Sequence, residues 1–234
     1  MKKIIVVSLL LFLFSMVLLA ADISAETPEG KALAERMQAI KRYSYAAKMG
    51  DRTQKSAILD DILNNFDKFG FSENDKELLQ MVSYLAEEGS IRQEYENNRL
   101  INDYPDVRRK SVQVLARIGG DSARDALINI LHTDQNPAVK AEVCNALAKV
   151  KDNKDGKALN ALVYIYRSTY RPDPYLIQSI ITAVKQIATT DASAYADAIY
   201  VLSEIQMGSH QRKIREEAYN AIQELSSNPN RNKS

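Results

Sequence analysis

The sequence is poor in the residues that build disulfides and metal sites. Its 234 residues include one cysteine, two histidines and no tryptophan. A single cysteine, Cys144, excludes an intramolecular disulfide, so packing alone must hold the fold together. His132 and His210 have no metal-ligand spacing around them, and both are expected on the surface. We therefore expect neither a metal ion nor a cofactor.

An excess of charge of one sign is also missing, and helix-breaking residues are few. The chain has 31 basic and 30 acidic residues, 8 glycines and 6 prolines. Proteins that bind nucleic acid usually carry a basic excess that neutralises phosphates, so nucleic acid is not an expected partner. The low content of glycine and proline suits long helices joined by short turns.

The N-terminal segment has the pattern of a secretory signal peptide. Lys2 and Lys3 precede an apolar run over residues 4–21, and small residues lead up to a cleavage point after Ala25. This predicts that residues 1–25 are a cleaved signal and that the protein is periplasmic or secreted. The alternative is a membrane-anchored protein that retains residues 4–21, because this run is close to the shortest length that spans a bilayer.

The rest of the chain has helical spacing of apolar residues nearly throughout. Asn136 and Asp173 each precede a proline, as capping side chains do at helix starts. Residues 90–104 are polar and ambiguous, and the tail over 227–234 is expected to be disordered. Helices are predicted over residues 28–49, 52–68, 74–88, 106–118, 121–133, 137–150, 156–170, 174–188, 191–206 and 210–226.

Four predicted helices repeat one apolar pattern. Equivalent first positions follow one another after 32, 37 and 38 residues, at Val107, Val139, Leu176 and Ile214. Further apolar residues stand eight and eleven positions after each of them. No single helix can bury such a face alone, so the units must stack on a shared core. The predicted fold is all-α, a right-handed α-solenoid of stacked helix pairs.

The repeated residues resemble a known family. The segment from Pro105-Asp106-Val107-Arg108 to Gly119 resembles the second helix of the HEAT repeat, in particular the bacterial repeats related to phycobilisome lyases. Residues 137–150 repeat this pattern, and 214–222 are a looser copy. The resemblance implies a HEAT/armadillo-like superhelix over 105–226, with residues 26–104 as a helical N-terminal cap or divergent repeats. It identifies architecture better than function.

The resemblance also assigns a role to the basic residue that follows the first apolar position. In families of this type such residues join neighbouring repeats through ion pairs, which implies that role for Arg108, Lys140 and Arg215. A ligand-binding role is the alternative.

Candidate catalytic groups have structural explanations. Gly120-Asp121-Ser122 is similar to an esterase nucleophile motif, but that motif needs a preceding strand and a histidine partner. Here it lies between two predicted helices, where Ser122 suits a cap. Cys144 shares a column with Val112, Ile181 and Tyr219, which favours an inert buried thiol. No catalytic residue is predicted.

The helical period places a second column opposite the core, on the helix that usually lines the concave surface of HEAT-like solenoids. Its neutral members include Gln113, Asn145, Thr182 and Asn220, which suit an extended peptide or a protein, although a solvated surface is the alternative. This candidate binding stripe consists of Arg109, Gln113, Asn145, Gln178, Thr182 and Asn220, with Ala141 and Ala148 on the same face.

A second candidate is the turn around Tyr175, because tyrosine and arginine often anchor interfaces. The surrounding cluster contains Tyr164, Tyr166, Arg167, Tyr170 and Arg171. Tyr166 and Tyr170 share the core stripe of their predicted helix, so half of this cluster is expected to be packing.

These observations predict an exported, non-enzymatic scaffold that binds a protein or peptide on a curved helical surface. One alternative is an accessory or maturation subunit of an enzyme, with its chemistry in a partner or at Cys144. Another is a membrane-anchored structural protein that retains residues 4–21 and so contacts the membrane.

Overall fold

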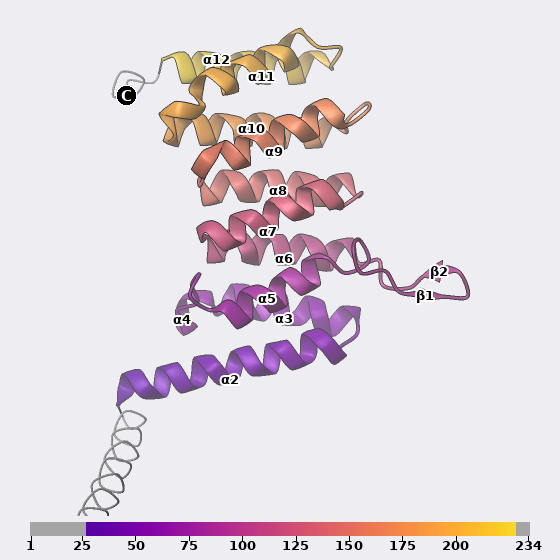
Figure 1. Ribbon diagram of the computed structural model, residues 1–234, viewed down its shortest axis with the longest axis vertical. Coiled ribbons are helices and arrows are strands. Elements are labelled where there is room, and N and C mark those ends of the chain that lie inside the picture. Colours follow the sequence, from indigo (N-terminus) through magenta and orange to yellow (C-terminus); the bar gives the residue numbers. More distant parts are fainter. Residues whose placement is uncertain (1–26, 228–234) are drawn as a thin grey trace, which may run out of the picture.

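A computed structural model describes residues 27–227 (Figure 1). The predicted signal over 1–25, the alternative anchor over 4–21 and all but the first residue of the predicted tail lie outside this range. Within residues 27–227, none of the helices combines the length and the apolar character needed to cross a bilayer.

The described chain is built of helices that form five consecutive pairs. These are α2/α3, α5/α6, α7/α8, α9/α10 and α11/α12, and together they give the all-α solenoid expected from the sequence. The helices are α2 (Pro28–Met49), α3 (Arg52–Asn64), α4 (Phe66–Phe69), α5 (Lys76–Ala86), α6 (Pro105–Ile118), α7 (Gly120–Thr133), α8 (Pro137–Val150), α9 (Lys157–Ser168), α10 (Pro174–Thr190), α11 (Tyr195–Met207) and α12 (Arg212–Ser226), with short 3₁₀ turns η1 (Lys154–Gly156) and η2 (Ala192–Ala194).

Most helix boundaries follow the sequence signals. The side chain of Asn136 accepts hydrogen bonds from the backbone at the start of α8, and Asp173 does the same for α10. One predicted boundary was wrong, because residues 52–68 form two helices. The break falls at Asn65, whose amide donates to the backbone carbonyl and the carboxylate of Asp61 at 3.1 and 2.8 Å.

The pairs stack so that the helices lie in two layers (Figure 1). The second layer contains α3, α6, α8, α10 and α12, which pack closely side by side. The first layer contains α2, α5, α7, α9 and α11, whose members contact each other much less. The core lies between the layers, and Val107, Val139, Leu176 and Ile214 are all at least 98% buried within it.

The second layer contains a fifth copy of the apolar pattern that the sequence analysis missed. Along α3 and into α4, Lys55, Leu59, Ile62, Leu63 and Phe66 stand at the offsets of the repeat. Lysine occupies the first core position of this copy and is buried there. The copy also precedes the next one by 52 residues, instead of the 32 to 38 found elsewhere.

The longer spacing comes from an insertion between α5 and α6. In the ambiguous segment 90–104, β1 (Tyr95–Glu96) pairs antiparallel with β2 (Arg99–Leu100). Asn97 and Asn98 join the strands with positive φ values of 49° and 63°, as tight hairpin turns require. Figure 1 shows this hairpin projecting from the edge of the stack where first-layer helices end and second-layer helices begin. We call this side the hairpin edge.

Candidate functional site

The predicted binding stripe lies on the outward surface of the second layer, but it is not a neutral row of free side chains. Arg109 and Gln113 on α6 both donate to Glu142 on α8, at 3.2 and 3.1 Å. Gln178 on α10 donates to Glu217 on α12 at 2.9 Å. Three of the six stripe residues therefore bridge neighbouring second-layer helices, and the acceptors are carboxylates.

The remaining stripe residues differ in how free they are. The hydroxyl of Thr182 donates to the carbonyl of Gln178 in its own helix at 3.0 Å. Asn145 is half-buried and Asn220 is exposed. Neither asparagine side chain has a hydrogen-bond partner within residues 27–227, so these two amides are the stripe's available groups.

Two other residues assigned to this face are buried. Ala141 has no exposed surface and Ala148 is 6% exposed. The reason is the position of α8 between α6 and α10, which cover its flanks as well as its core side. A helix with neighbours on both sides buries a wider sector than the periodicity of one helix suggests.

Most of the tyrosine-arginine cluster is exposed, and only Tyr166 among its residues is half-buried, so the expectation that half of the cluster is packing was wrong. Tyr175 and Tyr170 are 51% and 84% exposed. Tyr170 was expected in the core stripe of this helix, but α9 ends at Ser168, so Tyr170 lies in the following turn and not on the helix. Arg167 pairs with Glu204 on α11 at 3.1 Å, so this arginine links two first-layer helices.

The two histidines have different environments. His132 is exposed, as expected, and its ring lies edge-on to Tyr164. His210 was expected on the surface but is half-buried, and its Nε2 lies 3.0 Å from the hydroxyl of Tyr166. Burial lowers the pKa of His210 below its ordinary value. The same packing raises the pKa of Tyr166, chiefly by burial and then through Glu204.

The candidate catalytic groups lie in structural positions. Cys144 is completely buried in α8, and burial raises the pKa of its thiol to about 12. Ser122 is exposed in the first turn of α7, which begins at Gly120 without a side-chain cap. The expectation that Ser122 caps this helix was therefore wrong, since the helix starts two residues earlier.

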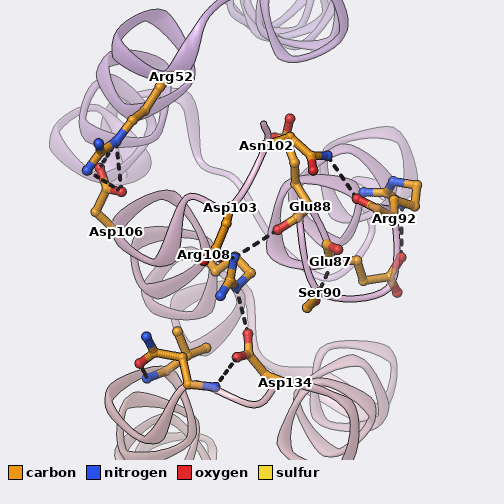
Figure 2. Close-up of polar contacts among 12 residues, drawn as sticks. Arg52, Glu87, Glu88, Ser90, Arg92, Asn102, Asp103, Asp106, Arg108 and Asp134 are labelled. Atoms are coloured by element: carbon orange, nitrogen blue, oxygen red, sulfur yellow. Dashed lines mark hydrogen bonds and ion pairs between the residues drawn. The ribbon is translucent and has the colours of Figure 1, made fainter. Parts of the chain in front are cut away.

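Arg108 has the bridging role implied by the family resemblance. Its guanidinium is 3% exposed and donates to Asp134 in the α7–α8 turn at 2.7 Å. It also donates to Asp103 at 2.7 Å and to the carbonyl of Glu88 at 3.0 Å (Figure 2). Lys140 and Arg215 do not share this role, because neither has an ion-pair partner within residues 27–227.

Two further buried charges were missed by sequence reasoning. Lys55, at the first core position of α3, pairs with the buried carboxylate of Glu88. Arg124 on α7 is 1% exposed and pairs with Asp121, Asp125 and Asp152 at 2.7 to 3.0 Å. Spacing alone did not reveal Lys55, whose partner Glu88 lies outside α3, and Arg124 combines two partners in its own helix with Asp152 from the segment after α8.

The comparison with known families agrees with this architecture for part of the chain. Residues 98–172, which contain α6 to α9, match the family model of HEAT repeats. The resemblance to HEAT repeats is thus confirmed for this segment. The relation to phycobilisome lyases and the division of the chain at residue 105 stay predictions. A search of the curated proteins gave no match.

Among solved structures, the chain is similar to engineered proteins. A crystal structure of an engineered protein has 21% identity and a TM-score of 0.49, over 89% of this chain and 87% of that one. A second engineered protein has 19% identity and a TM-score of 0.45, over 89% of this chain and 53% of that one. A designed armadillo repeat protein has 16% identity and a TM-score of 0.40, over 88% of this chain and 98% of that one.

Proposed function

We propose that the protein is an exported, non-enzymatic scaffold that binds a protein or peptide partner. The observation that carries this proposal is the continuous second layer, in which five helices lie side by side within residues 27–227. Stacked repeats of this kind provide an extended, preformed surface, which lowers the cost of ordering on binding.

The surface of the second layer combines fixed and available groups. Cross-helix bonds from Arg109, Gln113 and Gln178 hold neighbouring helices in register. Asn145 and Asn220 each offer a free amide, which can donate to and accept from a peptide backbone. Near-equal numbers of acidic and basic residues favour a protein partner over nucleic acid.

The test is capture of the partner from the native cell envelope, with cross-linking and mass spectrometry as the readout. Asn145→Lys combined with Asn220→Lys should abolish capture, because each change places an unpaired charge in the contact surface. Circular dichroism should show that the double variant keeps its helix content. At the exposed Asn220, the substitution should cost less than about 0.5 kcal/mol of folding free energy.

Tyr175→Ala is the contrasting variant, since it removes an exposed ring at the α9–α10 turn. Capture that survives the double lysine variant but fails with Tyr175→Ala would move the binding site to that turn. Capture that neither variant affects would contradict both sites and direct the search to residues 26–104.

A further inference from the structure

Four exposed apolar side chains lie on α2, the helix at one end of the stack (Figure 1). Leu33, Met37, Tyr45 and Met49 are 55%, 52%, 70% and 71% exposed. Together with Lys41 they occupy positions four residues apart, so that successive side chains lie next to each other on the helix surface. We call these five residues the α2 row, which extends about 24 Å along the helix.

The first half of α2 extends beyond the core of the array. The helix has 22 residues, whereas its partner α3 has 13. None of the residues from Pro28 to Gln38 is buried. The Arg36 guanidinium pairs with Asp75, just before α5, and so ties this part of the helix to the array. The exposed row is therefore held in place without adding a buried side chain to the core in its first half.

The side of α2 that carries this row is basic. At about 100° per residue, the helical period assigns half of the circumference, from Leu33 round to Arg42, to a sector that contains no buried residue of the helix. Both acidic residues of α2, Glu29 and Glu35, lie outside this basic sector. Its charged residues are all exposed, and none has an ion-pair partner in the described part of the chain. They are Lys31, Lys41, Arg42 and Lys48.

A second copy of this chain does not suit the basic sector. In a symmetric contact between two α2 helices, Lys41 in the middle of the row would face basic side chains of the other copy. On the neighbouring helix, Glu77 of α5 lines a hollow with Lys48, but these two side chains form no ion pair. Charge complementarity therefore calls for an anionic partner.

The mixture of side chains in the sector favours a lipid surface over an acidic protein. Lysine is depleted in the buried centres of protein–protein interfaces. Helices that lie on bilayers instead combine lysine and arginine with apolar side chains that reach between the headgroups. The stems of Lys41 and Lys48 can lie along the apolar region while their ammonium groups contact phosphates.

We propose that the basic sector of α2 docks on the surface of a membrane that contains anionic lipids. The four basic side chains contact headgroup phosphates, and the apolar members of the α2 row enter the headgroup region. This contact needs no retained anchor, so it differs from the alternative in which residues 4–21 span the membrane. It goes beyond the proposed scaffold role and leaves the stripe of the second layer free for a partner.

The experiment measures co-sedimentation with vesicles of phosphatidylcholine, with or without phosphatidylglycerol. It uses the chain from Glu26, because all five helix pairs lie within residues 27–227 and residues 4–21 are an apolar run that could itself bind lipid. The protein should bind the vesicles that contain phosphatidylglycerol, and binding should weaken as salt is raised. Lys31→Glu with Lys41→Glu should weaken this binding by about tenfold or more, because it reverses two charges at the lipid surface.

The matched control is Lys149→Glu with Arg215→Glu, which makes the same charge change at exposed positions of α8 and α12. This control should bind vesicles like the unaltered protein. The Asn145→Lys and Asn220→Lys variant, which tests the stripe, should also still bind them. Circular dichroism should show the same helix content in all these variants, since the altered positions are not buried.

A fluorescent reporter tests whether the apolar side chains enter the lipid. The sequence has no tryptophan, so Met37→Trp supplies a single indole in the α2 row. Its emission should shift to the blue on vesicles that contain phosphatidylglycerol, because the indole leaves water. Met207→Trp, at an 83% exposed position of α11, should show no shift.

Four results would overturn the proposal: no binding to phosphatidylglycerol vesicles, equal binding to phosphatidylcholine alone, equal weakening in the control, or no shift for Met37→Trp. Loss of partner capture in the Lys31→Glu and Lys41→Glu variant, without any vesicle binding by the unaltered protein, would also overturn it and favour an acidic protein on α2. The scaffold proposal is tested separately, because it predicts loss of capture in the stripe variant while vesicle binding is retained.

Discussion

Arg108 and Asp134 form a deeply buried ion pair between neighbouring helix pairs, with side chains 3% and 0% exposed. Removing one partner of such a pair leaves a charge that neither water nor the protein compensates fully. The pairs that Asp121 makes with Arg124 and Lys154 differ, because the Asp121 side chain is 56% exposed. Burial therefore separates two kinds of ion pair that look equivalent in the sequence.

We expect Asp134→Ala to lower the free energy of unfolding by about 3 kcal/mol, because Arg108 stays buried without its main partner. The exposed counterpart, Asp121→Ala, should lower the free energy of unfolding much less, because water solvates the exposed charges. Urea unfolding followed by circular dichroism measures both. Equal shifts of the two midpoints would show that burial does not decide the strength of these pairs.

Cys144 should react slowly in the folded protein. Burial raises the pKa of its thiol to about 12, so both access and thiolate are lacking at neutral pH. A thiol-reactive dye should label it slowly under native conditions and quickly in denaturant. Fast native labelling would favour the alternative of an accessory enzyme subunit.

His210 should make stability sensitive to mild acid. Burial lowers its pKa below 6.5, so the unfolded state binds a proton more readily than the folded state. The free energy of unfolding should therefore fall as the pH drops from about 7 to about 5. His210→Gln should flatten this dependence in denaturant titrations, whereas His132→Gln, at an exposed position, should leave it unchanged.

At the scale of elements, the periodicity of the sequence predicted most helices because each buries one continuous apolar face. The copy in α3 was missed because Lys55 occupies its first core position, where its charge is paired with Glu88 from a distant segment. Residues 90–104 stayed ambiguous because their hairpin exposes most side chains and has no apolar alternation. The buried lysine thus depends on a partner distant in sequence, whereas the hairpin depends on its turn and on backbone pairing.

The same limit applied to the binding stripe. The exposure of Asn220 followed from the period of a single helix, because α12 has a second-layer neighbour on one side only. The hydrogen bonds of Gln113 and Gln178 could not be predicted from one helix, because their acceptors lie on the next helix of the second layer. The offset between helices, which the sequence does not encode locally, decides which stripe residues are free.

Deletion of the last three long helices should leave the remaining helix pairs partly folded. Deleting residues 174–226 removes α10 to α12 but keeps the contacts among α2 to α8, because each unit packs mainly on its neighbours. Circular dichroism should retain helix, and hydrogen exchange should show loss of protection concentrated in α8 and α9. Complete loss of helix would instead show that the array folds only as a whole.

At the scale of the whole molecule, the expected localisation of the protein depends on whether its N-terminal segment is cleaved. We expect the native protein to begin near Glu26, shortly before α2 starts at Pro28. N-terminal sequencing of protein purified from the native cell checks this. Residues 1–21 still attached in a membrane fraction would favour the anchored alternative.

The unequal contact within the two layers makes the array mechanically anisotropic. Second-layer helices pack closely, and side chains such as Gln113 and Gln178 clamp their neighbours. First-layer helices contact each other less, so we expect that moving them apart costs less packing than moving second-layer helices apart. We therefore expect the molecule to resist bending that separates the second-layer helices. Bending that separates the first-layer helices should be easier, so a bound partner would change the curvature of the array more readily than its other dimensions.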